Sequence, residues 1–466
     1  MVSAPVLEKS GAAEGNGGPR GLFLLFVGAS YRTCSVGLRE RCRVLPEALS
    51  ETLLDLHEPP LEEILLLSTC NRTELYVVTT SPDEAMHGLA QFYQSRLGLP
   101  PENFDSLLHT CHGLDAARHL VTVAAGLDSM AIGEPEILDQ VREAGRVAQS
   151  AGTLGPVLTR ALRHAILGGR RAWGETGRGQ RPHSLSTAAV TAIQEDLGGL
   201  DGRTVVVIGT GRMGKLAASE LRGCGASSLL VIGRDLEHAQ GLANRVGGEA
   251  RDFSGLPAAV EAGDAVITCA AAPHFILRQE HLAGRLAHRP AEPLVIVDMG
   301  VPRNVEPTVG QLPGVRLLDI DCLASQLAKN TPDWESSLPR AKAVVEEEAL
   351  SFWQWLKQFP LTSAMADVYK RAEAIRQREV QRTLKRLPAL SEQDTARLND
   401  MTRAIVNKLL HQPLSHLREE GELALLTQIF GQHEVAVGRT GRAGKGSLMD
   451  FSRPPDKEGL YYDMGA

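Results

Sequence analysis

The stretch STCNRTELY, residues 68–76, places a cysteine two residues before an arginine, directly after an apolar run. A thiol at its ordinary pKa of about 8.5 is only a few per cent thiolate at pH 7, and a nearby cation raises that fraction. Arg72 could supply this cation to Cys70, or its planar guanidinium could hold a substrate carboxylate. The alternative is that Cys70 is a small apolar residue at the end of a core strand. Taken alone, the stretch favours this structural role.

A second group of candidates lies in RHLVTVAAGLDSMAIGEPEILDQV, residues 118–141. His119 falls on an expected helix, where a lone histidine is more often structural than catalytic. The stretch GLDSMAIGEPE then combines two glycines, Asp128, Ser129, Glu134 and a proline in eleven residues. Fixed turns and backbone donors of this kind are typical of a loop that grips a small polar ligand.

The third motif is GTGRMG, residues 209–214, which follows the apolar run VVVI and precedes an expected helix. In this context Gly209, Gly211 and Gly214 allow a tight turn and let backbone N–H groups approach a pyrophosphate at a helix N-terminus. We therefore expect a dinucleotide site. The alternative is a loop that needs glycine only for its turn.

The end of the next strand indicates which dinucleotide is bound. An NAD enzyme usually offers an acid there, whereas this chain has Gly233 followed by Arg234. The glycine leaves room, and the arginine can bind a 2′-phosphate with two nitrogens, so NADP is favoured over NAD. Asp235, the next residue, is the observation that weakens this preference.

A basic segment lies between residues 160 and 181, although the net charge of the chain is −7. The overall charge does not attract nucleic acid, so a nucleic-acid partner must meet a local patch. A solvated helical face and loop is an equally good interpretation. The segment contains one acid, Glu175, and six arginines: Arg160, Arg163, Arg170, Arg171, Arg178 and Arg181.

Length and composition exclude several classes of protein. A chain of 466 residues predicts about three domains. Hydrophobic residues at 43%, charged residues at 23% and aromatic residues at 4% are typical of a globular α/β and helical protein, not a fibre or a membrane protein. The seven cysteines are scattered without a CxxC pair, and the first apolar run is too short for a signal or a membrane span. We expect a cytoplasmic protein without a structural metal.

Three kinds of element must position these motifs. From residue 22 to about 110, apolar runs alternate with polar helical stretches, as in a small α/β domain. From residue 202, strands such as TVVVI, SLLVI, DAVIT and PLVIVD alternate with helices, as in a doubly wound parallel sheet. Residues 1–20 and 433–466 are expected to be flexible tails.

The chain becomes helical and charged from about Trp334, and we expect breaks at Pro360 and Pro388. Ser391 and Asp394 form a capping pattern at the start of the last helix. The helical stripes could pack within the chain, but a partner subunit is the better candidate. The first stripe holds Val368, Ala372, Ile375, Leu384 and Leu387, and the second holds Leu398, Ile405 and Leu409.

Four motifs in this order resemble the glutamyl-tRNA reductase family: STCNRTELY, RHLVTVAAGLDSMAIGEPEILDQV, GTGRMG and VDMGVPRNVEP. The resemblance covers about residues 22–417. It implies an α/β fold with an N-terminal α/β catalytic domain that binds glutamyl-tRNA (residues 21–182), a Rossmann-type NADPH-binding domain (183–333) and a C-terminal all-helical dimerisation domain (334–432). It also implies a homodimer and possible transfer of the product to glutamate-1-semialdehyde aminomutase.

The resemblance also implies roles for individual residues. Cys70 matches the nucleophile of the family and His119 matches a histidine important for activity. The substrate-contacting positions of the family fall on Thr69, Asn71, Arg72, Ser129, Glu134, Pro135, Glu136 and Gln140. Its cofactor-binding loop falls on Gly209, Thr210, Gly211, Arg212, Met213 and Gly214, and Arg234 joins the expected cofactor site through the argument on the 2′-phosphate given above. The chain departs from the family at Tyr31 and Ser35, where histidine and proline are usual, and at Glu136, where glutamine is usual.

The implied reaction begins when the Cys70 thiolate attacks the ester that joins glutamate to tRNA. The resulting thioester is reduced by NADPH, and glutamate-1-semialdehyde is released for tetrapyrrole synthesis. We assign Arg72 to the side-chain carboxylate of the substrate, while His119 either moves a proton or positions the ester. Two other interpretations remain: a noncatalytic regulator that binds tRNA or NADPH, and an ordinary NADP-dependent dehydrogenase of a small acid.

Overall fold

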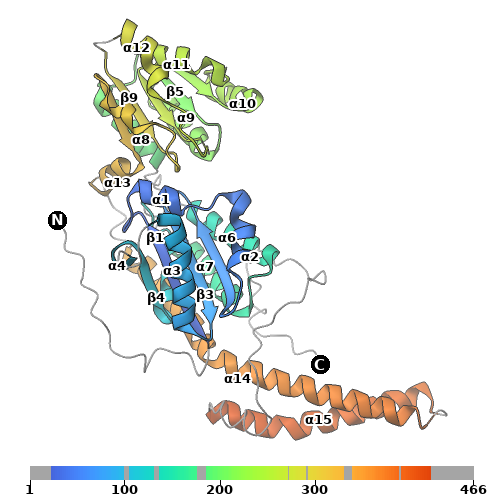
Figure 1. Cartoon of the computed structure of the whole chain (residues 1–466). Helices are drawn as coiled ribbons and strands as arrows, with labels where there is room; N and C mark the ends of the chain where they lie inside the picture. Colours follow the sequence, from blue (N-terminus) through green and yellow to red (C-terminus); the bar gives the residue numbers. More distant parts are fainter. Residues whose placement is uncertain are drawn as a thin grey trace.

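The computed structural model describes residues 22–98, 104–130, 136–175, 185–270, 272–289, 292–329, 338–387 and 390–420. It contains a four-stranded sheet, a six-stranded sheet and a pair of long helices, which follow one another along an elongated molecule (Figure 1). The expected tails at residues 1–20 and 433–466 lie outside the described residues. This order confirms the α/β architecture with a helical C-terminal part.

The first sheet is antiparallel, with strand order β2-β3-β1-β4. Its strands are β1 (Phe23–Ser30), β2 (Leu61–Ser68), β3 (Arg72–Thr79) and β4 (His109–His112). Every residue of β3 is buried, because β3 lies between two other strands and is covered on both faces. Only three residues connect β2 to β3, so Cys70 lies at the tip of a short hairpin.

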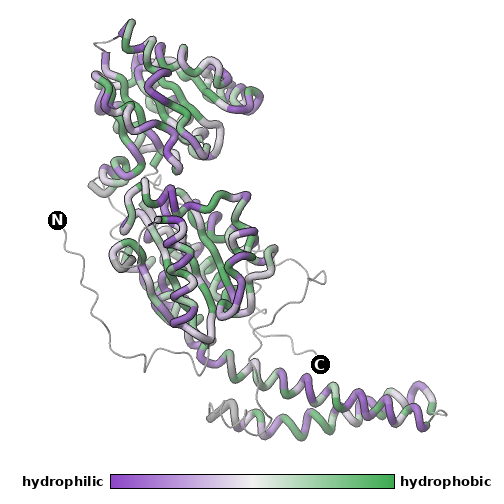
Figure 2. The backbone as a smooth tube through the Cα atoms, viewed as in Figure 1, coloured by the Kyte–Doolittle hydropathy of each residue, from purple (hydrophilic) through white to green (hydrophobic). Residues whose placement is uncertain are grey.

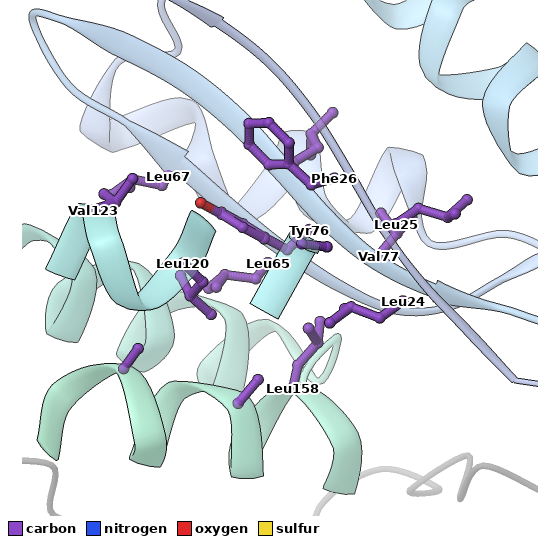
Figure 3. Close-up of a cluster of buried hydrophobic side chains, with 14 of the residues drawn as sticks. Leu24, Leu25, Phe26, Leu65, Leu67, Tyr76, Val77, Leu120, Val123 and Leu158 are labelled. Carbon is purple, nitrogen blue, oxygen red and sulfur yellow. The ribbon is translucent and has the colours of Figure 1, made fainter. Parts of the chain in front are cut away.

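Helices cover both faces of this sheet: α1 (Val36–Cys42), α2 (Leu49–Leu56), α3 (Pro82–Leu97), α4 (Phe104–Leu107), α5 (Leu114–Ala124), α6 (Glu136–Ala151) and α7 (Pro156–Glu175). Figure 3 shows Phe26 and Tyr76 of the sheet packed toward Leu120 of α5. The ring centroids of Phe26 and Tyr76 are 5.0 Å apart. The expected helix around His119 is confirmed as α5.

The second sheet is parallel, with strand order β10-β9-β8-β5-β6-β7. Its strands are β5 (Thr204–Ile208), β6 (Ser228–Ile232), β7 (Glu249–Arg251), β8 (Ala265–Thr268), β9 (Leu294–Asp298) and β10 (Val315–Asp319). Alternate residues of β5 enter different cores: Val205 and Val207 face one apolar cluster, while Val206 and Ile208 face another. This is the doubly wound sheet expected from the sequence, and its strand order reverses between β5 and β8, where such sheets bind ligands.

The helices of this part are α8 (Leu185–Leu197), α9 (Arg212–Gly223), α10 (Leu236–Val246), α11 (Leu256–Ala262), α12 (Ala283–His288) and α13 (Ile320–Lys329). Ion pairs join the two sheet domains. Arg39 on α1 donates to Asp321 on α13 at 2.7 Å, and the Arg303 guanidinium donates to the Glu40 carboxylate at 2.9 Å. The domains therefore share a polar contact around α1.

The C-terminal part consists of α14 (Leu338–Leu384) and α15 (Glu392–Glu420). The break expected at Pro360 is wrong, because α14 continues through that position. Proline costs about 3 kcal/mol or more inside a helix, but α14 is held on both sides of it. Phe352 packs into the core of the first domain, and Leu361 and Val368 pack against Leu414 of α15.

The end of α14 at Leu384 agrees with the second expected break, although residues 388–389 lie outside the described part. The capping pattern is confirmed: the Asp394 N–H donates to Ser391 Oγ at 3.1 Å, and Ser391 Oγ donates to the Asp394 carboxylate at 2.7 Å. Figure 2 shows apolar residues concentrated in the strands of both sheets and interspersed with polar ones along α14 and α15. Among the described helices, none combines the length and apolar character needed to cross a bilayer.

Candidate active site

Cys70 lies where the two sheet domains meet. Thr69 holds the hairpin tip, since its Oγ1 accepts the N–H groups of Asn71 at 3.1 Å and Arg72 at 3.2 Å. Cys70 itself is half-buried and packs against an apolar cluster that contains Val36 and Met130 of the first domain as well as Met299 and Val301 of the second. The hairpin tip therefore lies at the apolar contact between the two domains.

Arg43, which follows α1, is a cation whose charge interacts with Cys70. Burial lowers the pKa of the Arg43 guanidinium, and Cys70 opposes this shift electrostatically. The Val44 N–H donates to Ser68 Oγ at 2.9 Å, which holds this segment beside the end of β2. The Nε of Arg43 is buried and has no hydrogen-bond partner in the part of the chain that the structure describes.

Arg72 points away from this contact and is bound by two acids. Its Nη1 donates to Glu74 Oε1 at 2.7 Å and to Asp128 Oδ2 at 3.0 Å, and its Nη2 donates to the Asp128 carbonyl. The side chain is only 1% exposed. Burial would lower the pKa of Arg72, but the two carboxylates outweigh it and raise that pKa. The expected contact between Arg72 and a substrate carboxylate stays a prediction.

His119 is fixed by aromatic and polar neighbours. Its ring centroid lies 3.9 Å from that of Phe26, and its Nδ1 lies 2.8 Å from the Tyr76 hydroxyl. Tyr76 in turn donates to Glu74 Oε2 at 2.9 Å. Burial lowers the pKa of His119, so the imidazole is neutral at pH 7.

A pocket of about 190 Å³ opens beside His119. It contains both signs of charge, because Arg32 Nε donates to Asp128 Oδ1 at 2.5 Å, next to the Arg72 pairs. Burial would raise the pKa of Asp128, but Arg72 and Arg32 hold it below its ordinary value. The lining residues are Phe26, Gly28, Ser30, Arg32, Thr33, Glu74, His109, His119 and Asp128.

Three groups in this pocket have metal-ligand spacing. One nitrogen of His119 and one carboxylate oxygen each from Glu74 and Asp128 lie within 4.8 Å of one another. Arg72 already pairs with both carboxylates, so a cation is in place among the described residues. The arrangement suits a ligand that donates hydrogen bonds better than a divalent metal ion.

The remaining candidates for substrate binding are dispersed. Ser129 is buried, and its carbonyl accepts a hydrogen bond from the Tyr31 hydroxyl at 3.3 Å. Tyr31, which stands where the resembled family usually has histidine, therefore contacts the loop expected to bind the ligand. Gln140 is exposed on α6. Glu134 and Pro135 lie outside the described residues.

Glu136 reaches the second domain. Its Oε1 lies 3.0 Å from Arg212 Nε, and Asp139 Oδ2 lies 3.4 Å from Arg212 Nη1. Arg212 is the first residue of α9, directly after the glycine turn. The carboxylate that replaces the usual glutamine of the family is therefore paired with the cofactor motif.

The glycine motif has the geometry of a dinucleotide site. Gly209 has φ +117°, and a Cβ on Gly214 would lie 2.0 Å from the Gly209 carbonyl oxygen, so both positions require glycine. A Cβ on Gly211 would meet nothing within 4 Å, which leaves an open cradle at the N-terminus of α9. Thr210 and Met213 complete the turn, with Met213 packed against the core.

The acid that follows β6 caps the next helix. Asp235 caps α10, since its Oδ1 accepts the N–H groups of Glu237 at 2.9 Å and His238 at 3.2 Å. Arg234 is exposed beside Gly233. Asp235, the acid that weakened the preference for NADP, is therefore engaged as the N-cap of α10.

Part of the basic segment is used within the chain. The Arg171 guanidinium pairs with Glu347 at 2.6 Å and with Glu348 at 2.5 Å, both on α14. Arg160 lies 5.4 Å from the Trp355 ring centroid. Arg163 is exposed, and Arg178 and Arg181 lie outside the described residues. The patch expected for nucleic acid stays a prediction.

Sequence reasoning missed several residues of this site. Glu74 and Tyr76 are two of them, although they alternate along β3 with the expected Arg72 and so share its face. This period of two was a usable signal. Arg43 and His109 gave no local signal, because they reach the site only through the pairing of distant segments.

Comparisons with known proteins cover most of the chain. Family models match residues 27–176 (glutamyl-tRNAGlu reductase, N-terminal domain), 191–325 (shikimate / quinate 5-dehydrogenase) and 340–432 (glutamyl-tRNAGlu reductase, dimerisation domain). The second match, with the glycine motif inside it, identifies a dinucleotide-binding domain of the shikimate dehydrogenase type.

The individual relatives found are glutamyl-tRNA reductases that match most of the chain. A glutamyl-tRNA reductase from Moorella thermoacetica is 36% identical over 85% of this chain and 90% of its own length. One from Bacillus subtilis is 32% identical over 89% and 93%. The structure of a glutamyl-tRNA reductase from Methanopyrus kandleri is 31% identical and covers 86% of this chain and 99% of its own, with a TM-score of 0.43.

Proposed function

This chain belongs to the glutamyl-tRNA reductase family, and we propose that it performs the family's reaction through a thioester on Cys70. The reaction reduces glutamyl-tRNA(Glu) to glutamate-1-semialdehyde, releases tRNA and is the first step toward 5-aminolevulinate and tetrapyrroles. The observation that carries the proposed route is the place of Cys70, at a hairpin tip packed against the apolar cluster that the first domain shares with the dinucleotide-binding domain.

The residues at the edge of the second sheet suit NADPH. The open cradle at Gly211 and the N-terminus of α9 would hold the pyrophosphate. Arg234 would bind the 2′-phosphate beside Gly233, because Asp235 is occupied as a helix cap. When bound, this cofactor supplies a hydride.

The proposed acylation uses groups of the first domain. The Cys70 thiolate attacks the ester carbonyl, a bond forms between Sγ and the carbonyl carbon, and the bond to the tRNA 3′ oxygen breaks. Arg43 stabilises the anionic thiolate through its charge. The leaving oxygen takes up a proton, and the glutamyl group stays on the enzyme as a thioester.

The pocket beside His119 suits the glutamyl group. That group carries an ammonium and a side-chain carboxylate, and the pocket offers both the acids Glu74 and Asp128 and the guanidinium of Arg32. Arg32 binds Asp128 through Nε, which leaves its terminal nitrogens to meet a carboxylate. We therefore add Arg32 to Arg72 as a candidate for the substrate carboxylate.

The proposed assembly is a homodimer formed by α14 and α15. These helices pack on each other through a small cluster around Val368 and Leu414. Large apolar side chains nevertheless stay exposed in the single chain, on these helices and on the segment between them: Ile375, Leu387, Leu390, Met401, Ile405 and Leu409. A second copy of the same stripe would bury this surface. tRNA is proposed to bind through the remaining arginines of the basic segment.

Trapping the acyl-enzyme tests the proposed route. The full-length protein is incubated with glutamyl-tRNA labelled in the glutamyl group, without NADPH, and the labelled peptide is mapped by mass spectrometry. We expect the label on Cys70, and C70S should lose both label and aldehyde formation while still binding NADPH. C111S, which changes another partly buried thiol, is the matched control. A label on another residue, or substantial turnover by C70S, would contradict the thioester route.

A further inference from the structure

Three side chains on one face of β3 make a continuous chain of contacts to His119. Arg72 Nη1 donates to Glu74 Oε1 at 2.7 Å, Tyr76 donates to Glu74 Oε2 at 2.9 Å, and Tyr76 Oη lies 2.8 Å from His119 Nδ1. Glu74 and Tyr76 are fully buried. The single hydrogen of the Tyr76 hydroxyl therefore has to be assigned between its two partners, Glu74 and His119.

Counting hydrogens fixes the state of the imidazole. A tyrosine hydroxyl has one proton, and a carboxylate only accepts hydrogen bonds. Burial raises the pKa of Tyr76, so the hydroxyl keeps its proton, which is given to Glu74. The contact between Tyr76 Oη and His119 is then a hydrogen bond only if Nδ1–H is the donor. In a neutral imidazole this leaves Nε2 without a proton.

The second ring nitrogen lies on the side of the pocket. His119 Nε2 is 4.0 Å from Glu74 Oε1, and both residues line the pocket together with Asp128. Phe26 lies against the imidazole with ring centroids 3.9 Å apart, which opposes rotation of the ring. Nε2 and the oxygens of Glu74 and Asp128 thus form a set of three acceptors on one wall.

We propose that Tyr76 and Glu74 are positioning residues that hold His119 in the Nδ1–H form, so that its Nε2 accepts a hydrogen bond from the ammonium group of the substrate. A primary ammonium has three N–H donors and no acceptor, which matches the three acceptors of the wall. The inference rests on the proposed function only for the identity of the ligand. The state of His119 is a property of the chain itself.

The charge balance supports this choice of ligand. Arg72 and Arg32 already pair with the two acids, so the wall is close to neutral before the ligand binds. A monovalent ammonium, which brings a carboxylate with it in a glutamyl ester, adds no net charge. A hydroxyl in place of the ammonium would offer one donor instead of three.

The ¹⁵N shifts of His119 in the full-length protein test the state of the imidazole, with H119Q used to identify its resonances. We expect a protonated Nδ1 and an unprotonated Nε2 in the wild type, and loss of this preference in Y76F. Y93F is the matched control, since Tyr93 is equally buried but its hydroxyl binds the carbonyls of Val27 and Thr73. A wild-type protein with the proton on Nε2 would overturn the proposal without any variant.

Binding of two small esters tests the ammonium contact. Glutamate 1-methyl ester is compared with its 2-hydroxy counterpart, which lacks the ammonium. We expect the wild type and Y93F to prefer the amino ester by about tenfold or more, as for a hydrogen bond to a charged group, and Y76F to lose most of that preference. An equal preference in Y76F and Y93F would refute the role of Nε2. Neither readout needs turnover, so a failure to reduce glutamyl-tRNA would count against the proposed function alone.

Discussion

At the scale of single residues, two arginines that could act on Cys70 have different surroundings. Arg72, two residues along the chain, is enclosed by Glu74 and Asp128. Arg43 is 27 positions earlier, yet its charge interacts with Cys70. The sequence left open whether Arg72 lowers the pKa of the Cys70 thiol or holds a substrate carboxylate. The structure adds Arg43 as a second candidate for lowering that pKa.

We predict that Arg43→Met slows alkylation of Cys70 by iodoacetamide severalfold at pH 7. Removal of a nearby cation lowers the fraction of thiol present as thiolate, which is the species that reacts. Mass spectrometry of the Cys70 peptide separates its rate from those of the other six cysteines. Arg41→Met, which removes an exposed arginine two positions earlier, should react like the wild type. An unchanged rate in R43M would return the tuning role to Arg72 or to the hairpin itself.

The site residues that could be predicted from the sequence were those in local patterns. The glycine turn is an example, because its spacing alone dictates a tight bend before a helix. Tyr76 shows the opposite case. Its period-two relation to Glu74 was visible, but its contact with His119 depends on how α5 crosses β3, which no local pattern encodes.

At the scale of elements, a buried acid on one strand holds the start of a helix. Glu63 on β2 accepts the N–H groups of Val157 at 3.0 Å and Leu158 at 2.6 Å, at the N-terminus of α7. These amides have no partner within the helix. Burial raises the pKa of Glu63 to about 7, although the backbone hydrogen bonds oppose this shift.

We predict that Glu63 makes the first domain less stable as the pH rises. The folded carboxyl, with a pKa of about 7, binds its proton more tightly than the unfolded one, with a pKa of 4.5. Its contribution is therefore complete below about pH 4.5 and is lost as the pH passes 7. Between these limits the free energy of unfolding should fall by about 3 kcal/mol relative to E63Q.

Urea titrations at several pH values, read from the fluorescence of Trp173, Trp353 and Trp355, measure this difference. E62Q is the control, because Glu62 is the adjacent acid but is only partly buried. Parallel stability curves for the wild type and E63Q would show that Glu63 binds its proton no more tightly in the folded state than in the unfolded state.

The prediction of elements was most successful where strands were buried on both faces. Apolar runs such as TVVVI specify a strand and its burial together. The expected break at Pro360 failed because the penalty of one proline is local, whereas the packing that outweighs it comes from residues on α5, α7 and α15.

At the scale of the whole molecule, the ion pairs of Arg212 join the cofactor motif to the catalytic domain. Arg212 is half exposed, and an exposed pair contributes at most about 1 kcal/mol. The other contacts around Arg39 and Arg303 remain when it is lost. The ion pairs of Arg212 can therefore shift the equilibrium between contacting and separated domains, but they do not hold the domains together alone.

We predict that R212E increases the radius of gyration measured by small-angle X-ray scattering, because its new carboxylate repels Glu136 and Asp139. Loss of the about 1 kcal/mol that the ion pair contributes at most would shift the equilibrium toward separated domains by up to about fivefold. The double variant R212E/E136R should restore the wild-type dimensions. The exchange E143R/R146E, within an exposed pair on α6 alone, should leave them unchanged. If R212E keeps the wild-type dimensions, the bridge does not restrain the domains.

The unbroken course of α14 has a consequence for distance. Its 47 residues form a rod of about 70 Å. One end is embedded in the core that holds His119, and Arg118, next to that histidine, pairs with Glu346 of the rod at 2.6 Å. In a dimer that pairs at the far ends of the two α14 helices, the helices would keep the two sheet-containing parts of the dimer apart. The distance between those parts would then depend on the number of residues in α14.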